Sequence, residues 1–181
     1  MPSPSHPSRY LKFLIPFLFL FIFPPLHAQK LRSQPFHPTQ EMLDQIKKDL
    51  KKIEKGWQNN DFCIAIKEDL MHPKIIDMAG GKDILIENTQ LEMQAIGNFT
   101  IENITIGNPT HFTIYNNVIY GIVPFQFTMN FEGNSVNNNA FLLILSENQG
   151  KKFYYFDSNS LKNPLIENLF PDIKIAIKLP Q

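Results

Sequence analysis

The sequence is poor in cysteine and in charge of either sign. Cys63 is the single cysteine among 181 residues, which excludes a framework of intrachain disulfides. The 17 basic and 17 acidic residues cancel, and charged residues make up only 19% of the chain. Because proteins bind nucleic acids through an excess of positive charge, we expect no nucleic-acid partner.

Signatures of metal, phosphate and acid–base chemistry are also missing. His37, His72 and His111 follow none of the spacings of zinc sites, and we expect neither a metal nor a cofactor. Gly80-Gly81-Lys82 lacks the rest of a phosphate-binding loop and is typical of a turn between helices. No carboxylate stands alone inside an apolar strand pattern, where burial would raise its pKa for catalysis. The sequence therefore shows no evident catalytic machinery.

What the chain does have, first, is a short apolar run near its N-terminus. Residues 13–26 are almost wholly apolar, follow Arg9 and Lys12, and end shortly before Ala28. This order predicts a signal peptide over 1–28, because a run of about 14 residues is shorter than the roughly 20 that span a membrane. We therefore expect an exported protein, periplasmic or extracellular, with an uncleaved membrane anchor as the alternative. Residues 29–38 have two prolines and no periodicity, and they are predicted to form a flexible linker.

The next part of the chain has the periodicity of helices. Apolar residues, Trp57 among them, recur at steps of three and four over 39–58, and Thr39 can cap this helix. A second helix is predicted over 62–71. A short helix is predicted between Pro73 and the glycine pair at 80–81, and a longer one over 82–96.

After Gly97 the pattern changes to that of β-strands. β-branched and aromatic residues dominate five segments separated by turn sequences: 98–106, 110–115, 118–131, 138–146 and 151–157. Gly121 and Pro124 in the third segment predict a bend or bulge, because proline donates no hydrogen bond to a partner strand. A turn of helix is predicted over 164–170. The alternation over 173–179 predicts an added edge strand protected by lysines.

Helices followed by an antiparallel meander predict an α+β fold, with N-terminal helices packed on a strongly curved antiparallel sheet. Several short motifs stand in a characteristic order: Trp57 with Asp61-Phe62, His72-Pro73-Lys74, Gly80-Gly81-Lys82, Ile106-Gly107-Asn108-Pro109, Val123-Pro124 with Phe127-Thr128-Met129, and Tyr154-Tyr155-Phe156-Asp157. In this order the chain resembles small secreted bacterial members of the nuclear transport factor 2-like superfamily over about 40–172. The resemblance implies a cone-shaped α+β roll in a single domain, 39–181, with a C-terminal extension. It also implies a pocket at the open end of the roll and pairing of two copies through the sheet.

The candidate binding residues are those that could face the inside of such a cone. Aromatic rings with a polar tip suit pockets for small apolar or amphipathic ligands. The candidates are Trp57, His72, Tyr115, Tyr120, Gln126, Tyr154 and Asp157. For His72 and Asp157 the alternative roles are a helix cap and a strand-end cap.

These observations predict a secreted ligand-binding or protein-interaction domain without catalytic residues. The alternative is an isomerase-like or hydrolase-like enzyme that uses a pocket tyrosine with His72 or Asp157.

Overall fold

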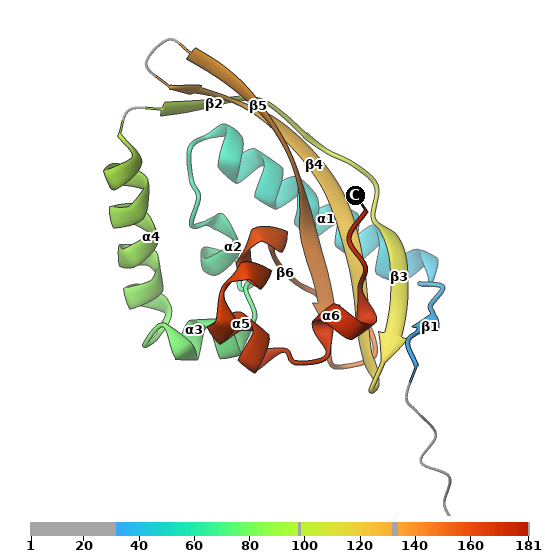
Figure 1. Cartoon of the computed structure of the whole chain (residues 1–181). Coiled ribbons are helices and arrows are strands. Elements are labelled where there is room, and N and C mark those ends of the chain that lie inside the picture. The colour runs from blue at the N-terminus through green and yellow to red at the C-terminus, as the bar shows by residue number, and fades with distance from the viewer. Residues whose placement is uncertain (1–31, 98, 132–133, 181) are drawn as a thin grey trace, which may run out of the picture. The chain divides into compact units, whose positions relative to one another are not determined.

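Two long antiparallel strands form the centre of the fold in the computed structural model, which describes residues 32–97, 99–131 and 134–180. β4 (Val118–Phe131) pairs with β5 (Asn134–Ser146) without a shift of register, from Ile119 opposite Ser146 to Phe131 opposite Asn134. β5 begins earlier than the predicted 138–146. Both strands bend along their length (Figure 1).

One edge of β4 pairs with two strands in turn. β3 (Thr110–Tyr115) pairs with its first half and β2 (Phe99–Ile106) with its second half. Pro124 lies between the two partners, and its carbonyl accepts a hydrogen bond from the Gly107 N–H at 2.8 Å. A Cβ on Gly107 would lie 2.9 Å from the Pro124 ring, so the close approach requires glycine. Of the bend or bulge predicted at Gly121 and Pro124, β4 shows the bend (Figure 1) but not the bulge, because the register shifts lie in β2 and β3.

The sheet is completed by one short strand at each end. β6 (Tyr154–Asp157) pairs with β5, and β1 (Gln34–Pro35) pairs with β3, which gives the order β1-β3-β4-β5-β6 with β2 beside β4. β1 falls in the segment predicted to be a flexible linker. In this stretch the backbone bonds to β3, and the Phe36 N–H continues the pairing to the Phe112 carbonyl at 2.9 Å. The predicted signal peptide, 1–28, lies outside the described residues.

One face of the sheet is covered by the first helix, α1 (Gln40–Gln58). The Thr39 side chain caps it by accepting from the Met42 N–H at 3.3 Å, as predicted. Ile46, Leu50 and Ile53 of α1 are buried against β4, β5 and β6. This helix places its apolar stripe on the sheet and its lysines toward solvent.

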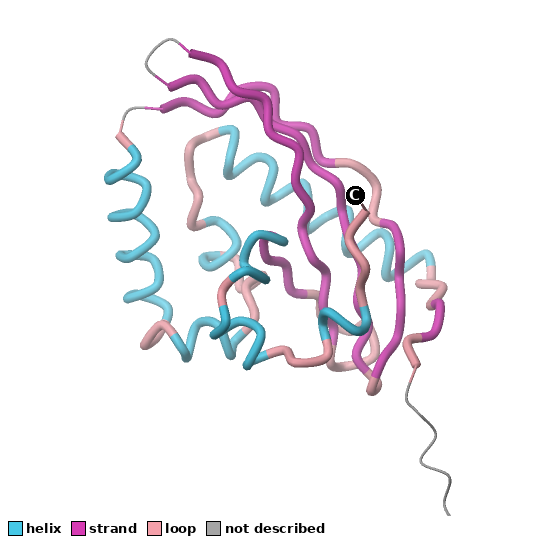
Figure 2. The backbone as a smooth tube through the Cα atoms, in the orientation of Figure 1, coloured by secondary structure: helices cyan, strands magenta, loops and turns pink. Residues whose placement is uncertain are grey.

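The opposite face is covered by the C-terminal segment. This segment consists of a 3₁₀ turn η1 (Ser158–Lys162), α5 (Pro164–Leu169) and α6 (Ile173–Ala176). It buries Ile166, Phe170 and Ile173 against alternate residues of the same strands. Figure 2 shows α1 and the C-terminal segment on the two sides of the strands. Successive residues of a strand point to opposite faces, so each strand contributes to two separate cores.

Three helices connect α1 to the sheet: α2 (Ile64–Lys67), α3 (Pro73–Met78) and α4 (Lys82–Ile96). The helix predicted over 62–71 is too long. Asp69 adopts a φ of 56°, in the left-handed region, where a right-handed helix cannot continue.

The edge strand predicted over 173–179 is also wrong. Ile173, Ala176 and Ile177 are buried against the sheet at helical spacing, whereas Ile175 is 55% exposed. The sequence fits both periods, and burial against the face of the sheet selects the helix.

The described elements form an α+β fold of helices on an antiparallel sheet. Among the described helices, none combines the length and the apolar character that a membrane span requires.

Candidate functional site

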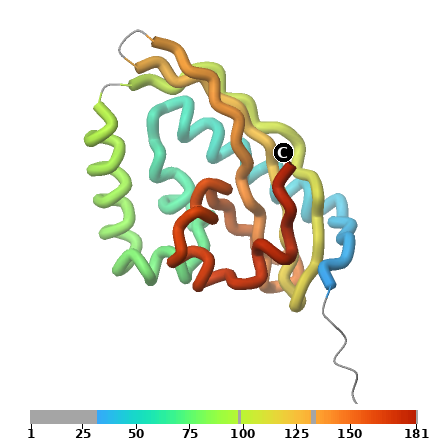
Figure 3. The backbone as a smooth tube through the Cα atoms, viewed as in Figure 1, coloured from blue at the N-terminus to red at the C-terminus, as the bar shows by residue number. Residues whose placement is uncertain are grey.

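An apolar cavity of about 460 Å³ lies between α4, the C-terminal end of α1 and the sheet. Residues of α1, α4, β2 and β4, most of them apolar or aromatic, form more than half of its wall, and the other lining residues come from around α2, α3, β5, β6, η1 and α5. α4 and β2 are consecutive elements of the chain (Figure 3), and both supply residues that line the cavity.

The aromatic part of the wall comes from strand alternation in the second half of β4. Phe125, Phe127 and Met129 share the face of the sheet that α1 covers, and all three line the cavity. Trp57, at the end of α1, packs at 5.3 Å from Phe125, and Phe125 stacks on Phe127 at 5.8 Å between ring centroids. These rings form a continuous aromatic surface.

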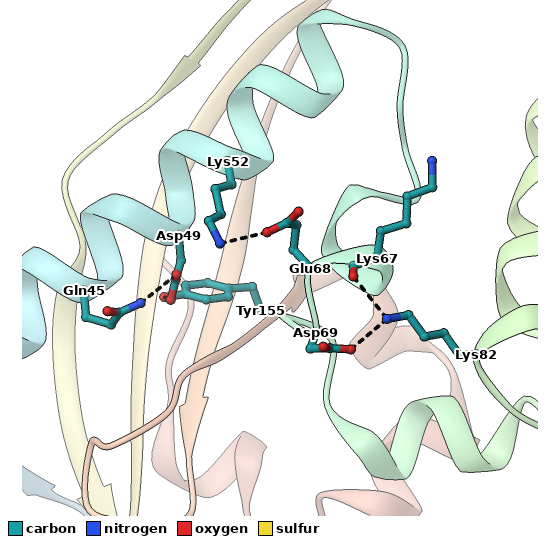
Figure 4. Close-up of polar contacts among 8 residues, drawn as sticks. All are labelled: Gln45, Asp49, Lys52, Lys67, Glu68, Asp69, Lys82 and Tyr155. Carbon is teal, nitrogen blue, oxygen red and sulfur yellow. Dashed lines mark hydrogen bonds and ion pairs between the residues drawn. The ribbon is translucent and has the colours of Figure 1, made fainter.

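The wall opposite these rings is formed by α4, which has no buried residue. Met93 and Ile96 of this helix line the cavity. Its N-terminal end is held by Lys82, whose ammonium donates to Asp69 Oδ1 at 2.8 Å and to the Lys67 carbonyl at 3.1 Å (Figure 4). α4 is therefore packed less tightly than α1, β4 and β5, each of which has several buried residues.

Few polar side chains reach the cavity, and several already have partners. The Thr89 hydroxyl donates to the Leu85 carbonyl at 2.8 Å. Asp157 Oδ1 accepts from the Asn159 N–H at 2.9 Å and so caps η1. Glu92, in contrast, makes no hydrogen bond or ion pair with any described residue.

Beneath the cavity, a buried carboxylate joins α1 to β6. Asp49 is 3% exposed, and it accepts from Gln45 Nε2 at 2.8 Å and from the Tyr155 hydroxyl at 3.2 Å. Figure 4 shows Gln45 and Asp49 on one helix with the Tyr155 ring beside them. Burial and the neighbouring Asp49 both raise the pKa of Tyr155, so this hydroxyl stays protonated and donating.

The sequence-based interpretation missed this pair, although one signal was present. Asp49 stands three residues after Ile46 and four before Ile53, which places it on the apolar stripe of α1. A carboxylate at such a position needs a buried partner, and no local pattern identifies Tyr155 as that partner.

The predicted site residues separate into three groups. Trp57 and Asp157 line the cavity, whereas Gln126 is exposed on the opposite face of β4. The remaining four belong to the core beneath the C-terminal segment or to its edge: His72, Tyr115, Tyr120 and Tyr154. Burial raises the pKa of Tyr120 to about 12. The tyrosine on the cavity wall is Tyr155, whose hydroxyl donates to Asp49.

His72 is a helix cap, which is one of the two roles that the sequence left open. Its Nδ1 accepts from the Lys74 N–H at 3.2 Å, and the ring is 2% exposed between the rings of Tyr154 and Phe170. Nε2 lies 3.4 Å from Glu147 Oε2 but lacks the geometry of a hydrogen bond. Burial lowers the pKa of His72, and this effect outweighs the opposing influence of Glu147.

In the described part of the chain, no three His, Cys, Asp or Glu side chains are grouped as metal ligands would be. Comparisons with protein-family models, with curated proteins and with solved structures found no match to this chain.

Proposed function

We propose that the chain is an exported domain that binds a small apolar or amphipathic molecule in the cavity between α4 and the sheet. The observation that carries this proposal is the cavity itself, at about 460 Å³ and lined mostly by apolar and aromatic residues. Pockets for small molecules commonly measure about 300–1,000 Å³ and combine such a lining with a few polar groups. Trp57 and Asp157 supply one large ring and one polar group at this wall.

The export and family parts of the proposal rest on the sequence. The apolar run at 13–26 supports a signal peptide, and the order of motifs supports a roll of the nuclear transport factor 2-like superfamily. The antiparallel sheet with α1 across one face is consistent with such a roll.

The proposal includes pairing of two copies through the sheet. The C-terminal segment covers the face of the sheet opposite α1, over the half of β4 and β5 near Ser146. A second copy would therefore contact the other half of that face, which the segment leaves uncovered. Gln126, Asn137 and Asn139 are exposed there.

The test is native mass spectrometry of residues 29–181 purified from the envelope of the source cell. We expect the chain to carry a discrete small molecule. The variant Phe127→Lys, which puts a charge on the cavity wall, should lose this molecule. Gln126→Lys, the adjacent residue on the opposite face, should keep it. A folded wild-type chain without any adduct, or retention by folded Phe127→Lys, would contradict the proposal.

Catalysis is the second candidate, and the position of Asp157 on the cavity wall next to Tyr155 favours it. An isomerase-like or hydrolase-like reaction would use this carboxylate as the base. If Asp157→Asn abolishes turnover of a bound compound but leaves its binding unchanged, this second function replaces the first.

A further inference from the structure

The charged side chains on the cavity wall have one sign. Glu92 of α4 and Asp157 of β6 are both carboxylates, and no lysine, arginine or histidine is among the described residues that line the cavity. An anionic head group would therefore be repelled and would find no charged partner at this wall.

Among the described residues, no lysine, arginine or histidine forms an ion pair with either carboxylate. Lysines on the elements around the cavity pair with other acids at 2.8–2.9 Å: Lys52 with Glu68, Lys67 with Asp61, and Lys82 with Asp69. Glu92 has no partner in the described part of the chain. Asp157 caps η1 through Oδ1, while its Oδ2 has only the Asn159 side-chain amide at 3.4 Å.

The aromatic rings of the wall favour the same sign of ligand. The faces of Trp57, Phe125 and Phe127 carry the negative part of the ring quadrupole, which attracts cations. Phe62 and Phe99, which pack at 5.5 Å between ring centroids, extend this lining toward α4. The rings can contact both an apolar body and an ammonium group.

We propose that the cavity selects cationic amphiphiles, in which an apolar chain or ring carries an amine or quaternary ammonium head. The body lies against the aromatic and methionine side chains, and the head lies near Glu92 and Asp157. This inference rests on the proposed binding function, and it predicts an order among ligands that share one apolar body.

The test uses Trp57, the single tryptophan of the chain, as a fluorescent reporter on the cavity wall. Three probes with similar chains are titrated below their micelle concentrations or, for the alcohol, below its solubility limit: decyltrimethylammonium, decanol and decanoate. We expect the ammonium compound to bind about tenfold more tightly than the alcohol, and decanoate to bind most weakly. This preference should shrink as salt is raised, because Glu92 is exposed and its charge is screened.

A pair of variants tests whether Glu92 is a carboxylate that attracts the ammonium head. Glu92→Gln should remove a large part of the preference for the ammonium compound over decanol. Glu87→Gln, on the same helix but outside the cavity lining, should leave this preference unchanged. Both side chains are exposed, so neither substitution threatens the fold.

The two proposals fail in different ways. If none of the three probes alters Trp57 fluorescence, binding of small amphiphiles in this cavity is itself contradicted. If all three bind equally, or decanoate binds best, the binding function stands and the cationic preference is overturned. An equal effect of Glu92→Gln and Glu87→Gln would assign the preference to net charge and overturn the site.

Discussion

The two halves of the long β4–β5 pair show how one sheet can serve two purposes. In the half near Ser146, residues of both strands are buried on both faces, with α1 on one side and the C-terminal segment on the other. In the distal half, the α1 side bears the cavity lining, and the other side exposes Gln126, Asn137 and Asn139. The register between the strands is continuous through both halves. The difference therefore lies in what covers the strands.

The change in cover coincides with a change in the side chains of β4. Before Pro124, alternate residues such as Tyr120 and Ile122 are buried beneath the C-terminal segment. After it, the same face carries Gln126 and Thr128. We infer that the first half supplies most of the stability, because it alone buries both faces, and that the second half can hold an open cavity.

The largest expected effect compares one truncation in each half. Leu143→Ala removes a fully buried side chain of the half covered on both faces and should lower the free energy of unfolding by about 3 kcal/mol. Met129→Ala, at the half-buried cavity wall, should cost less than about 1 kcal/mol, because its side chain already borders empty space. Chemical denaturation of both variants measures the difference. Equal losses of unfolding free energy would contradict the inference that the half near Ser146 supplies most of the stability.

A smaller effect is expected at Tyr155, where the core meets the cavity. Tyr155→Phe removes the hydroxyl that donates to buried Asp49 and should cost about 2 kcal/mol in urea unfolding. Tyr154→Phe, on the opposite face of β6, should cost less than about 0.5 kcal/mol, since its hydroxyl bonds to no described residue. If the two substitutions lower the free energy of unfolding equally, the hydrogen bond to Asp49 does not stabilise the attachment of α1.

The smallest effect concerns the edge of the core beneath the C-terminal segment and depends on pH. The pKa of His72 is lowered from 6.5 in the folded chain, so below about pH 6.5 the unfolded state binds a proton that the folded state excludes. Stability is therefore complete above this pH and falls as the pH drops toward the folded pKa.

The matched variant for this test is His72→Asn, which keeps an acceptor for the Lys74 N–H and cannot titrate. It should show a shallower loss of melting temperature between about pH 7 and pH 5 than the wild type. Glu147, whose pKa is lowered from 4.5 chiefly by Lys74, contributes below this range. Identical slopes would show that His72 titrates alike in both states.

Much of the element order could be predicted from local pattern. The helix at 39–58 with its Thr39 cap, the helix at 82–96 and the central strands are confirmed, because periodicity and caps act over a few residues. One error falls where two local signals compete: the tail at 173–179 fits strand and helix alike, and burial selects the helix.

The candidate site was less predictable, because facing direction depends on contacts between distant segments. Trp57 and Asp157 line the cavity, but Gln126 lies on the other face and Tyr120 in the other core. The register across Pro124 sets these directions, and a shift of one residue would exchange every face.

The types and order of most elements and the apolar stripe of α1 follow from spacing along the chain, so local sequence is sufficient to specify them. Contacts between distant segments specify the rest: Asp49 accepts a hydrogen bond from Tyr155, 106 residues away, and the C-terminal segment covers the face of the sheet opposite α1. The tertiary structure also places Glu92 and Asp157 on the cavity wall with no lysine, arginine or histidine among the described lining residues. Contacts between distant segments depend on which faces of the helices and the sheet are buried against each other. The spacing of residues within one segment does not determine this.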